Sequence, residues 1–171
     1  VMEARADVTT DSREQLLAEA YCLRAFVHFD LINLYAKWYD PATAATDKAV
    51  PLSLKIDIGQ SFIPTTVEKV YEQVFADLQE AEKYMQVEQQ TGAYLYRFSK
   101  KALKAFQARV YLYHQDWKQA QETAESLLAA CPLEDLTTTE AQPWTYTSKE
   151  AILALETVSS TVMKEDMYVL D

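Results

Sequence analysis

The sequence predicts an all-α domain of paired helices joined by long loops. Four segments repeat apolar residues with helical spacing, near 12–35, 66–86, 99–114 and 117–131. Three of these segments begin at a side chain that is suited to cap a helix. The 171 residues include only two glycines, which suits long helices better than a sheet with many tight turns. We therefore expect residues 1–171 to form one helical domain, as part of a longer parent chain.

Composition argues against several classes of binding partner. The formal net charge is −10, which argues against a nucleic-acid backbone as the partner. No basic run is present that would hold an anionic membrane surface, and no apolar run is long enough to span a bilayer. Cys22 and Cys131 both lie on apolar helix faces, so we expect two free thiols rather than a disulfide. Nothing in the sequence indicates a metal ion or a cofactor.

The first predicted helix is apolar along most of its length. Ser12, with Gln15 three residues later, has the spacing of a capping box. We expect one buried stripe made of Leu16, Ala20, Leu23, Val27, Leu31 and Leu34, widened by Phe26, Phe29 and Tyr35. This helix should be central to the core.

Arg24 and His28 lie one turn apart inside this apolar run. They could form an anion-binding or acid–base site. No nucleophile accompanies His28, however, so we favour a packed histidine and an Arg24 that is satisfied by a carboxylate or a carbonyl.

Residues 36–64 break the helical periodicity and predict a long loop, with a short extended piece at 50–54. Trp38 and Tyr39 stand at its start. They could stack on a ligand ring, but such aromatic side chains more often close the end of a core, half-buried.

The second predicted helix opens with Thr65 as a cap, paired with Glu68 in a capping box. Its apolar stripe is regular: Val67, Val70, Tyr71, Val74, Leu78, Ala81 and Met85. A loop follows at 87–98, with Tyr94 and Tyr96 among its aromatic residues.

The segment 96–132 predicts two helices joined by a very short turn. In the first helix one apolar face holds Leu103, Phe106, Val110 and Tyr113, and a polar stripe holds Lys100, Lys104, Gln107 and Tyr111. In the second the stripe is Ala120, Thr123, Ala124, Leu127, Leu128 and Cys131. Asp116 should cap this helix, with Gln119 closing a capping box, and Pro132 should end it.

Small residues in this hairpin resemble a tetratricopeptide (TPR) repeat. Ala108 and Ala120 let two backbones approach closely, Tyr111 can fill the gap above them, and Pro132 closes the unit. Gln115 stands where the repeat usually has glycine. Such hairpins are general scaffolds, so the pattern predicts a fold rather than a function.

After Pro132 the periodicity weakens. Residues 133–147 are turn-like and contain two further aromatic residues, Trp144 and Tyr146, while residues 149–158 could form a strand or a short helix. No phosphate loop, nucleophile elbow, zinc-protease motif or calcium-binding loop occurs, so we expect no enzyme activity. The residues alone predict an acidic, all-α interaction or binding module.

Five blocks, in order, resemble the SusD/RagB family: AEAYCLRAFVHFDLINLYAKWYD, AVPLSLKID, PTTVEKVYEQVFADLQEAEKYM, YRFSKKALKAFQARVYLYHQDWKQAQETAESLLA and SKEAILALE. The resemblance covers residues 12–156. It implies a SusD-like α-α superhelix of TPR-like hairpins with long loops. It further implies oligosaccharide binding without catalysis at the cell surface of the outer membrane, in a SusC/SusD-like nutrient uptake complex with a TonB-dependent transporter. The family's lipid anchor, its contact with the membrane, is absent from this chain.

We consider one alternative function, a TPR-type scaffold that binds a protein and no sugar. For sugar binding, an accessible aromatic ring is the expected contact. The candidates from the loops are Trp144 first, then Tyr146, Trp38 and Tyr39. The exposed polar helix faces, with Glu122 and Glu125, would be left for the transporter.

Overall fold

The computed structural model describes residues 12–56, 59, 62–131, 133, 135, 137, 148 and 150–154. These residues form four α-helices and one 3₁₀ turn: α1 Arg13–Tyr35, α2 Val67–Tyr84, η1 Gly92–Tyr94, α3 Lys100–Tyr113 and α4 Trp117–Ala130. The all-α prediction is confirmed, and every predicted helix boundary lies within two residues of the observed one. None of the described helices has the length and apolar character needed to cross a membrane.

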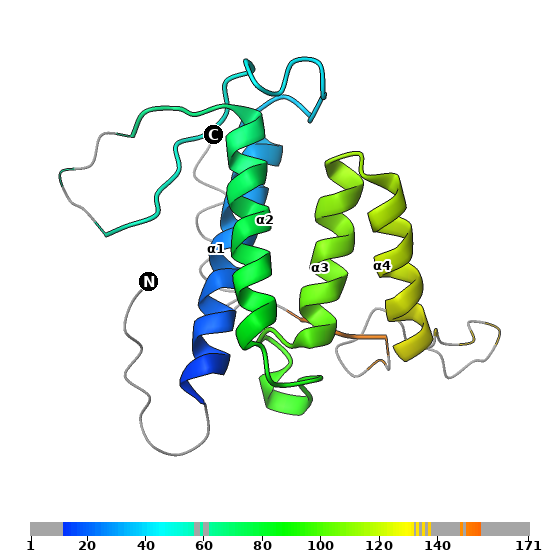
Figure 1. Ribbon diagram of the computed structural model, residues 1–171. Helices are drawn as coiled ribbons and strands as arrows, with labels where there is room; N and C mark the ends of the chain where they lie inside the picture. The colour runs from blue at the N-terminus through cyan, green and yellow to red at the C-terminus, as the bar shows by residue number, and fades with distance from the viewer. Residues whose placement is uncertain are drawn as a thin grey trace, which may run out of the picture.

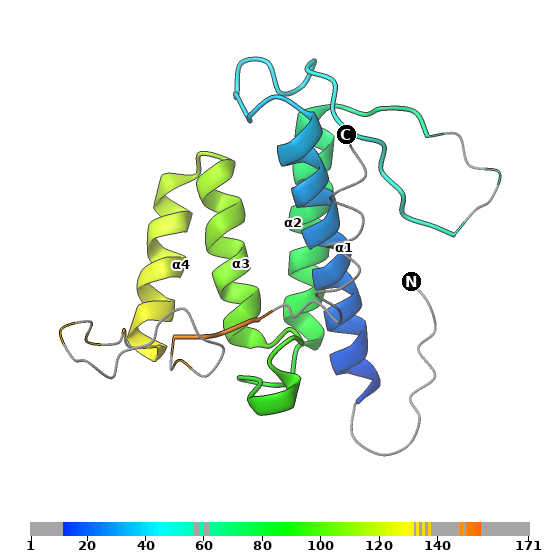
Figure 2. The ribbon, with the colours of Figure 1, turned by 180° about the vertical axis from the view of Figure 1, so that it is seen from behind.

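The helices are arranged as two antiparallel pairs. Helix α1 lies against α2, α3 lies against α4, and α2 is the helix that meets α3 (Figure 1). Seen from behind, α1 faces the viewer with no other described helix in front of it (Figure 2). One side of α1 is therefore left without a helical neighbour in the described part of the chain.

Local hydrogen bonds explain where the helices begin. Ser12 Oγ accepts from the backbone N–H of Gln15 at 3.1 Å, and Ser99 Oγ accepts from that of Ala102 at 3.2 Å. Asp116 Oδ1 accepts from the N–H of Gln119 at 3.3 Å, as predicted. The N–H of Asp116 itself donates to the Tyr111 carbonyl at 3.0 Å.

The predicted cap of α2 is wrong by one residue. Thr66, not Thr65, caps the helix, because its Oγ1 accepts from the N–H of Lys69 at 3.4 Å. The backbone of Thr65 is held in an extended pairing, in which its carbonyl accepts from the N–H of Ala49 at 2.8 Å. This pairing keeps Thr65 outside the helix. It joins residues 48–50 to residues 65–66, whereas the sequence predicted the extended stretch at 50–54, where residues 51–54 form no strand.

The prediction for the core face of α2 is confirmed. All seven residues of its apolar stripe are buried: Val67, Val70, Tyr71, Val74, Leu78, Ala81 and Met85. They pack in one cluster with residues from α1 and α3. Helix α3 contributes Leu103, Phe106 and Val110, as expected, but Tyr113 of the same predicted face is half exposed. Gln107, which the sequence placed on the polar stripe, is buried.

The prediction for the core face of α1 is wrong at most positions. The buried apolar residues are Ala18, Cys22, Ala25, Phe29 and Ile32, of which only Phe29 was in the predicted stripe, whereas Ala20, Leu23, Val27 and Leu34 are exposed. Because α1 is apolar on nearly every side, its periodicity could not identify the face that meets α2. Cys22 and Cys131 are free thiols, as predicted, and burial raises the pKa of Cys22 to about 12.

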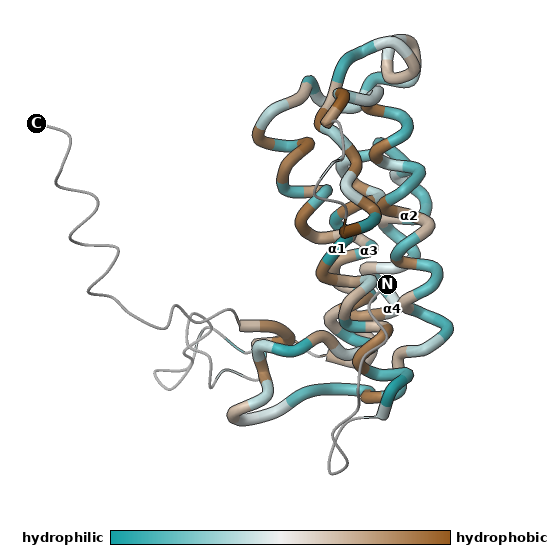
Figure 3. The backbone as a smooth tube through the Cα atoms, turned by 90° about the vertical axis from the view of Figure 1, so that its left-hand side faces the viewer, coloured by the Kyte–Doolittle hydropathy of each residue, from teal (hydrophilic) through white to brown (hydrophobic). Residues whose placement is uncertain are grey.

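Two pieces of the scaffold lie outside the regular helices. The loop after α1 carries exposed apolar side chains in its later part: Ile56, Phe62 and Ile63. Figure 3 shows how hydrophobic and hydrophilic residues alternate along the described backbone. In the turn between α3 and α4, Gln115 has φ +65°. That is the left-handed conformation for which helical hairpins ordinarily use glycine.

Candidate functional site

The two aromatic candidates that follow α1 have opposite environments. The Trp38 side chain is 85% exposed, while Tyr39 is half-buried and packs against the core. The expectation of half-buried packing is right for Tyr39 and wrong for Trp38. Residues 37–40 form no helix, so the helical period does not place these two rings on one face.

Tyr39 belongs to a cluster of rings between the two helix pairs. Its ring centroid lies 5.2 Å from that of Tyr71 on α2 and 4.0 Å from that of His114 after α3. Tyr111 stacks on Phe75 at 5.3 Å and 28°. Burial raises the pKa of Tyr71 to about 12 and lowers that of His114. These contacts join the two pairs, and Tyr111 fills space against α2 rather than only above Ala120.

Trp38 is exposed just beyond the end of α1. Leu34 and Tyr35, in the last turn of the helix, are also exposed. The loop beyond it is held by Asp47, which pairs with Lys37 Nζ at 2.5 Å and accepts from Thr43 Oγ1 at 2.6 Å. The hydrogen bond from Lys37 lowers the pKa of Asp47. Of the four candidate residues, Trp38 is the one that the structure shows accessible for stacking.

The other pair of candidates, Trp144 and Tyr146, lies outside the described residues. The structure leaves both as predictions. The loop aromatics Tyr94 and Tyr96 beside η1 are described, and each is about half exposed.

Arg24 is satisfied by a carboxylate, as the sequence predicted. Its Nε donates to Asp77 Oδ2 at 2.8 Å and its Nη2 donates to Asp77 Oδ1 at 2.5 Å. Gln73 Nε2 also donates to Asp77 Oδ1, at 2.8 Å. The Asp77 side chain is 2% exposed and that of Arg24 is 24% exposed. The hydrogen bond to Asp77 raises the pKa of Arg24.

Asp77 was not among the residues predicted from the sequence. The signal was available, because Asp77 lies three residues after Val74 and directly before Leu78 on the buried stripe of α2. A carboxylate at such a position requires a cationic partner. His28, as predicted, is packed: it is buried, its Nδ1 has no hydrogen-bond partner in the described part of the chain, and burial lowers its pKa.

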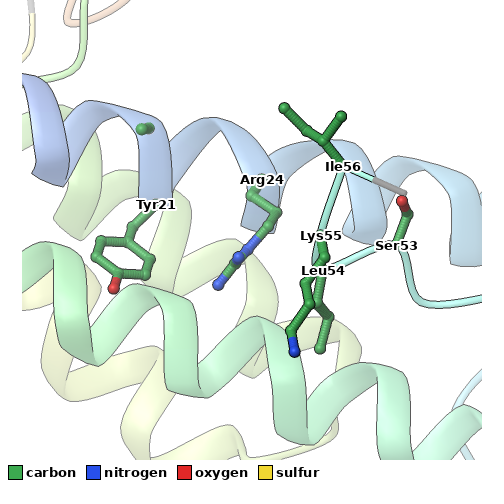
Figure 4. A pocket seen from close by; sticks show the side chains of 7 residues that line it. Tyr21, Arg24, Ser53, Leu54, Lys55 and Ile56 are labelled. Atoms are coloured by element: carbon green, nitrogen blue, oxygen red, sulfur yellow. The ribbon is translucent and has the colours of Figure 1, made fainter. Parts of the chain in front are cut away.

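An open cavity of about 450 Å³ lies beside the Arg24–Asp77 pair. Helix α1 lines one side, and residues 53–56 of the following loop line the other (Figure 4). Its lining residues are Ala20, Tyr21, Arg24, Ser53, Leu54, Lys55 and Ile56. The Arg24 Cζ atom lies 5.3 Å from the centroid of the Tyr21 ring, in cation–π contact. Sequence reasoning missed this site, because no local pattern places residues 53–56 beside α1.

Comparison with known proteins places these features in context. Residues 1–112 match a SusD-like family that is described as "Starch-binding associating with outer membrane". SusD-like protein P38 of Formosa agariphila is 32% identical over 120 residues, which are 68% of this chain and 21% of that protein.

Three solved structures are similar in fold. A SusD superfamily protein from Bacteroides vulgatus is 27% identical, with a TM-score of 0.62, over 72% of this chain and 28% of that one. A SusD-like carbohydrate binding protein from the same organism is 22% identical, with a TM-score of 0.69, over 86% and 31%. A laminarin binding SusD-like protein is 25% identical, with a TM-score of 0.56, over 76% and 26%. The chain thus spans less than a third of the length of each relative.

Proposed function

The chain belongs to the SusD-like family, and on that premise we propose that it is part of a protein that binds oligosaccharides at the cell surface. The match over residues 1–112 is the observation that carries this proposal, since it includes α1, α2 and most of α3. The likeness to a laminarin binding protein of the same fold supports a carbohydrate ligand. We propose binding without turnover, at the outer membrane.

We propose Trp38 as the contact to sugar within the described residues. Sugars present apolar C–H faces, and aromatic rings hold them by lying against those faces. Trp38 is exposed, as are Leu34 and Tyr35 in the last turn of α1, whereas Tyr39 packs in the ring cluster. Trp144 and Tyr146 remain further candidates for the same role.

The proposed partner is a TonB-dependent, SusC-like transporter. Glu122 and Glu125 on α4 are exposed, and they offer a polar helix face on the α3–α4 hairpin. Reversing both charges should reduce co-purification of the transporter with the full-length protein. Unchanged co-purification would exclude this face as the contact.

A matched pair of tryptophan variants tests the sugar site. Trp117 on α4 is also exposed, at 61%, so Trp117→Ala controls for the loss of a surface indole. With laminarin and starch oligosaccharides titrated by calorimetry, we expect Trp38→Ala to weaken binding about tenfold, roughly 1.4 kcal/mol. Trp117→Ala should bind as the parent chain does.

Three outcomes are informative. Equal affinities of the two variants would show that Trp38 is not the contact, and Trp144→Ala would then be measured in the same way. New reducing ends after incubation would contradict binding without turnover. A chain that binds no oligosaccharide but retains the transporter would favour the alternative, a TPR-type protein scaffold.

A further inference from the structure

The cavity between α1 and residues 53–56 combines apolar walls with hydrogen-bond donors. Tyr21 and Arg24 stand on the helical side, and Leu54, Lys55 and Ile56 come from the loop (Figure 4). Its volume of about 450 Å³ falls in the range of small-ligand sites, roughly 300–1,000 Å³. Trp38 does not line it, so this is a different location from the proposed stacking surface.

The charge of the cavity is opposite to that of the whole chain. The chain carries a formal net charge of −10, yet the lining includes two cations, Arg24 and Lys55, and no carboxylate. Asp77, behind Arg24, is already engaged by the guanidinium and by Gln73. Asp77 and Arg24 therefore neutralise each other, and Lys55 is the lining cation that has no carboxylate partner among the described residues.

Lys55 and Arg24 retain donors that nothing in the described structure uses. Lys55 is exposed and forms no ion pair among the described residues. Arg24 has five N–H donors, and its bonds to Asp77 occupy only Nε and Nη2. Because Asp77 fixes the guanidinium in place, its remaining edge is pre-organised for a second acceptor.

We propose that this cavity binds an acidic sugar residue through its carboxylate or sulfate group. Lys55 and the remaining edge of Arg24 would hold the anionic group, while Leu54 and Ile56 would cover the apolar face of the ring. The assignment to a sugar rests on the proposed function. The assignment to an anion rests only on the charges and donors of the site.

The first experiment compares ligands that differ in charge. Glucuronate, glucose 6-sulfate, glucose and inorganic sulfate are titrated into the chain and followed by NMR, at 50 mM and 300 mM salt. We expect both acidic sugars to bind at least tenfold more tightly than glucose, and to weaken with salt. Equal affinity for glucose, or no binding of either acidic sugar, would overturn the proposal. Inorganic sulfate that binds as tightly as glucose 6-sulfate would overturn the assignment to a sugar.

The second experiment uses matched variants. Lys55→Gln should weaken the acidic sugars five- to tenfold, whereas Lys104→Gln, the same charge change on an exposed part of α3, should leave them unchanged. Ala20→Trp should occlude the cavity without disturbing the core, because Ala20 is exposed. Equal effects of the two lysine changes would show general electrostatic attraction and contradict a site here. Trp38→Ala should not alter these affinities. The test of this cavity is therefore independent of the test of the sugar-stacking site at Trp38.

Discussion

The side chain of Gln15 holds the carbonyl of Phe98, which lies 83 residues later in the chain, by a hydrogen bond of 3.2 Å from Nε2. Its Oε1 accepts from the backbone N–H groups of Gln86 at 2.9 Å and Val87 at 3.0 Å. One buried amide at the start of α1 thus satisfies the backbone on both sides of the loop between α2 and α3. The capping role expected for Gln15 is replaced by this long-range one.

Gln15→Ala should destabilise the chain by about 2–3 kcal/mol, because it leaves buried backbone groups without partners. Urea denaturation followed by circular dichroism measures the change. Gln121→Ala provides the control, since Gln121 is exposed and bonds only to Glu125 within α4. That control should change stability by no more than about 0.5 kcal/mol. A loss of similar size in both variants would contradict the role given to Gln15.

Removing one partner of the Arg24–Asp77 pair should destabilise the chain strongly, whereas replacing both partners with apolar residues should change its stability little. Asp77→Ala leaves the guanidinium without its partner and should destabilise by about 3 kcal/mol, whereas Arg24→Met with Asp77→Leu should recover most of that loss. The measurement is a double-mutant cycle by urea denaturation. The exposed Lys83–Glu80 pair, treated in the same way, should couple by less than about 1 kcal/mol. Additive effects at Arg24 and Asp77 would contradict the prediction.

Phe106 should be among the most sensitive positions of α3. Phe106 packs against Phe26 at 5.4 Å and Phe29 at 5.5 Å, and Leu103 is buried one turn earlier. Phe106→Ala and Leu103→Ala should each cost about 2–5 kcal/mol. Leu112→Ala, on the same helix but half exposed, should cost under about 1 kcal/mol. Thermal unfolding measures the loss of stability in each of the three variants. Equal losses would show that the core is misplaced.

Stability should fall as the solution becomes mildly acidic. Burial lowers the pKa of both His28 and His114 below the ordinary value of about 6.5. The unfolded chain then takes up protons that the folded chain still resists, so the free energy of unfolding decreases as the pH falls through about 6.5. The urea midpoint should be lower at pH 5.5 than at pH 7.5.

The histidine variants provide the control for this pH effect. His28→Leu should lessen the decrease, and His28→Leu with His114→Phe should nearly abolish it. Differences in absolute stability between these variants do not matter, because each is compared with itself at the two pH values. A decrease that persists unchanged in the double variant would assign the effect to other groups.

The buried face of a helix could be predicted where apolar residues lie on one side of the helix and charged residues on the other. The stripe of α2 alternates apolar and charged residues at the helical period, and all seven predicted residues are buried. Helix α1 has no such contrast: Leu23 and Val27 of the predicted stripe face solvent, while Ala18, Ala25 and Ile32, which were not predicted, face the core. The existence of both helices was predictable, but the orientation of α1 depends on where α2 and α3 lie.

The candidate site was less predictable for a related reason. The exposure of Trp38 follows from the packing of its neighbour Tyr39 against His114, a residue that lies 75 positions later. The cavity beside Arg24 likewise needs the loop residue Lys55 to return to α1. No local period encodes contacts of this kind, whereas the carboxylate partner of Arg24 could be anticipated from the cost of burying a lone charge.

Helix α4 buries a single residue, Ala120, although its turn with α3 spans only residues 114–116. A short turn makes the hairpin quick to close, since little chain entropy is lost in bringing its ends together. Its small buried area also makes it easy to open. In native-state hydrogen exchange, the amides of α4 should therefore lose protection through local opening well before those of α2, which exchange only when the whole core unfolds.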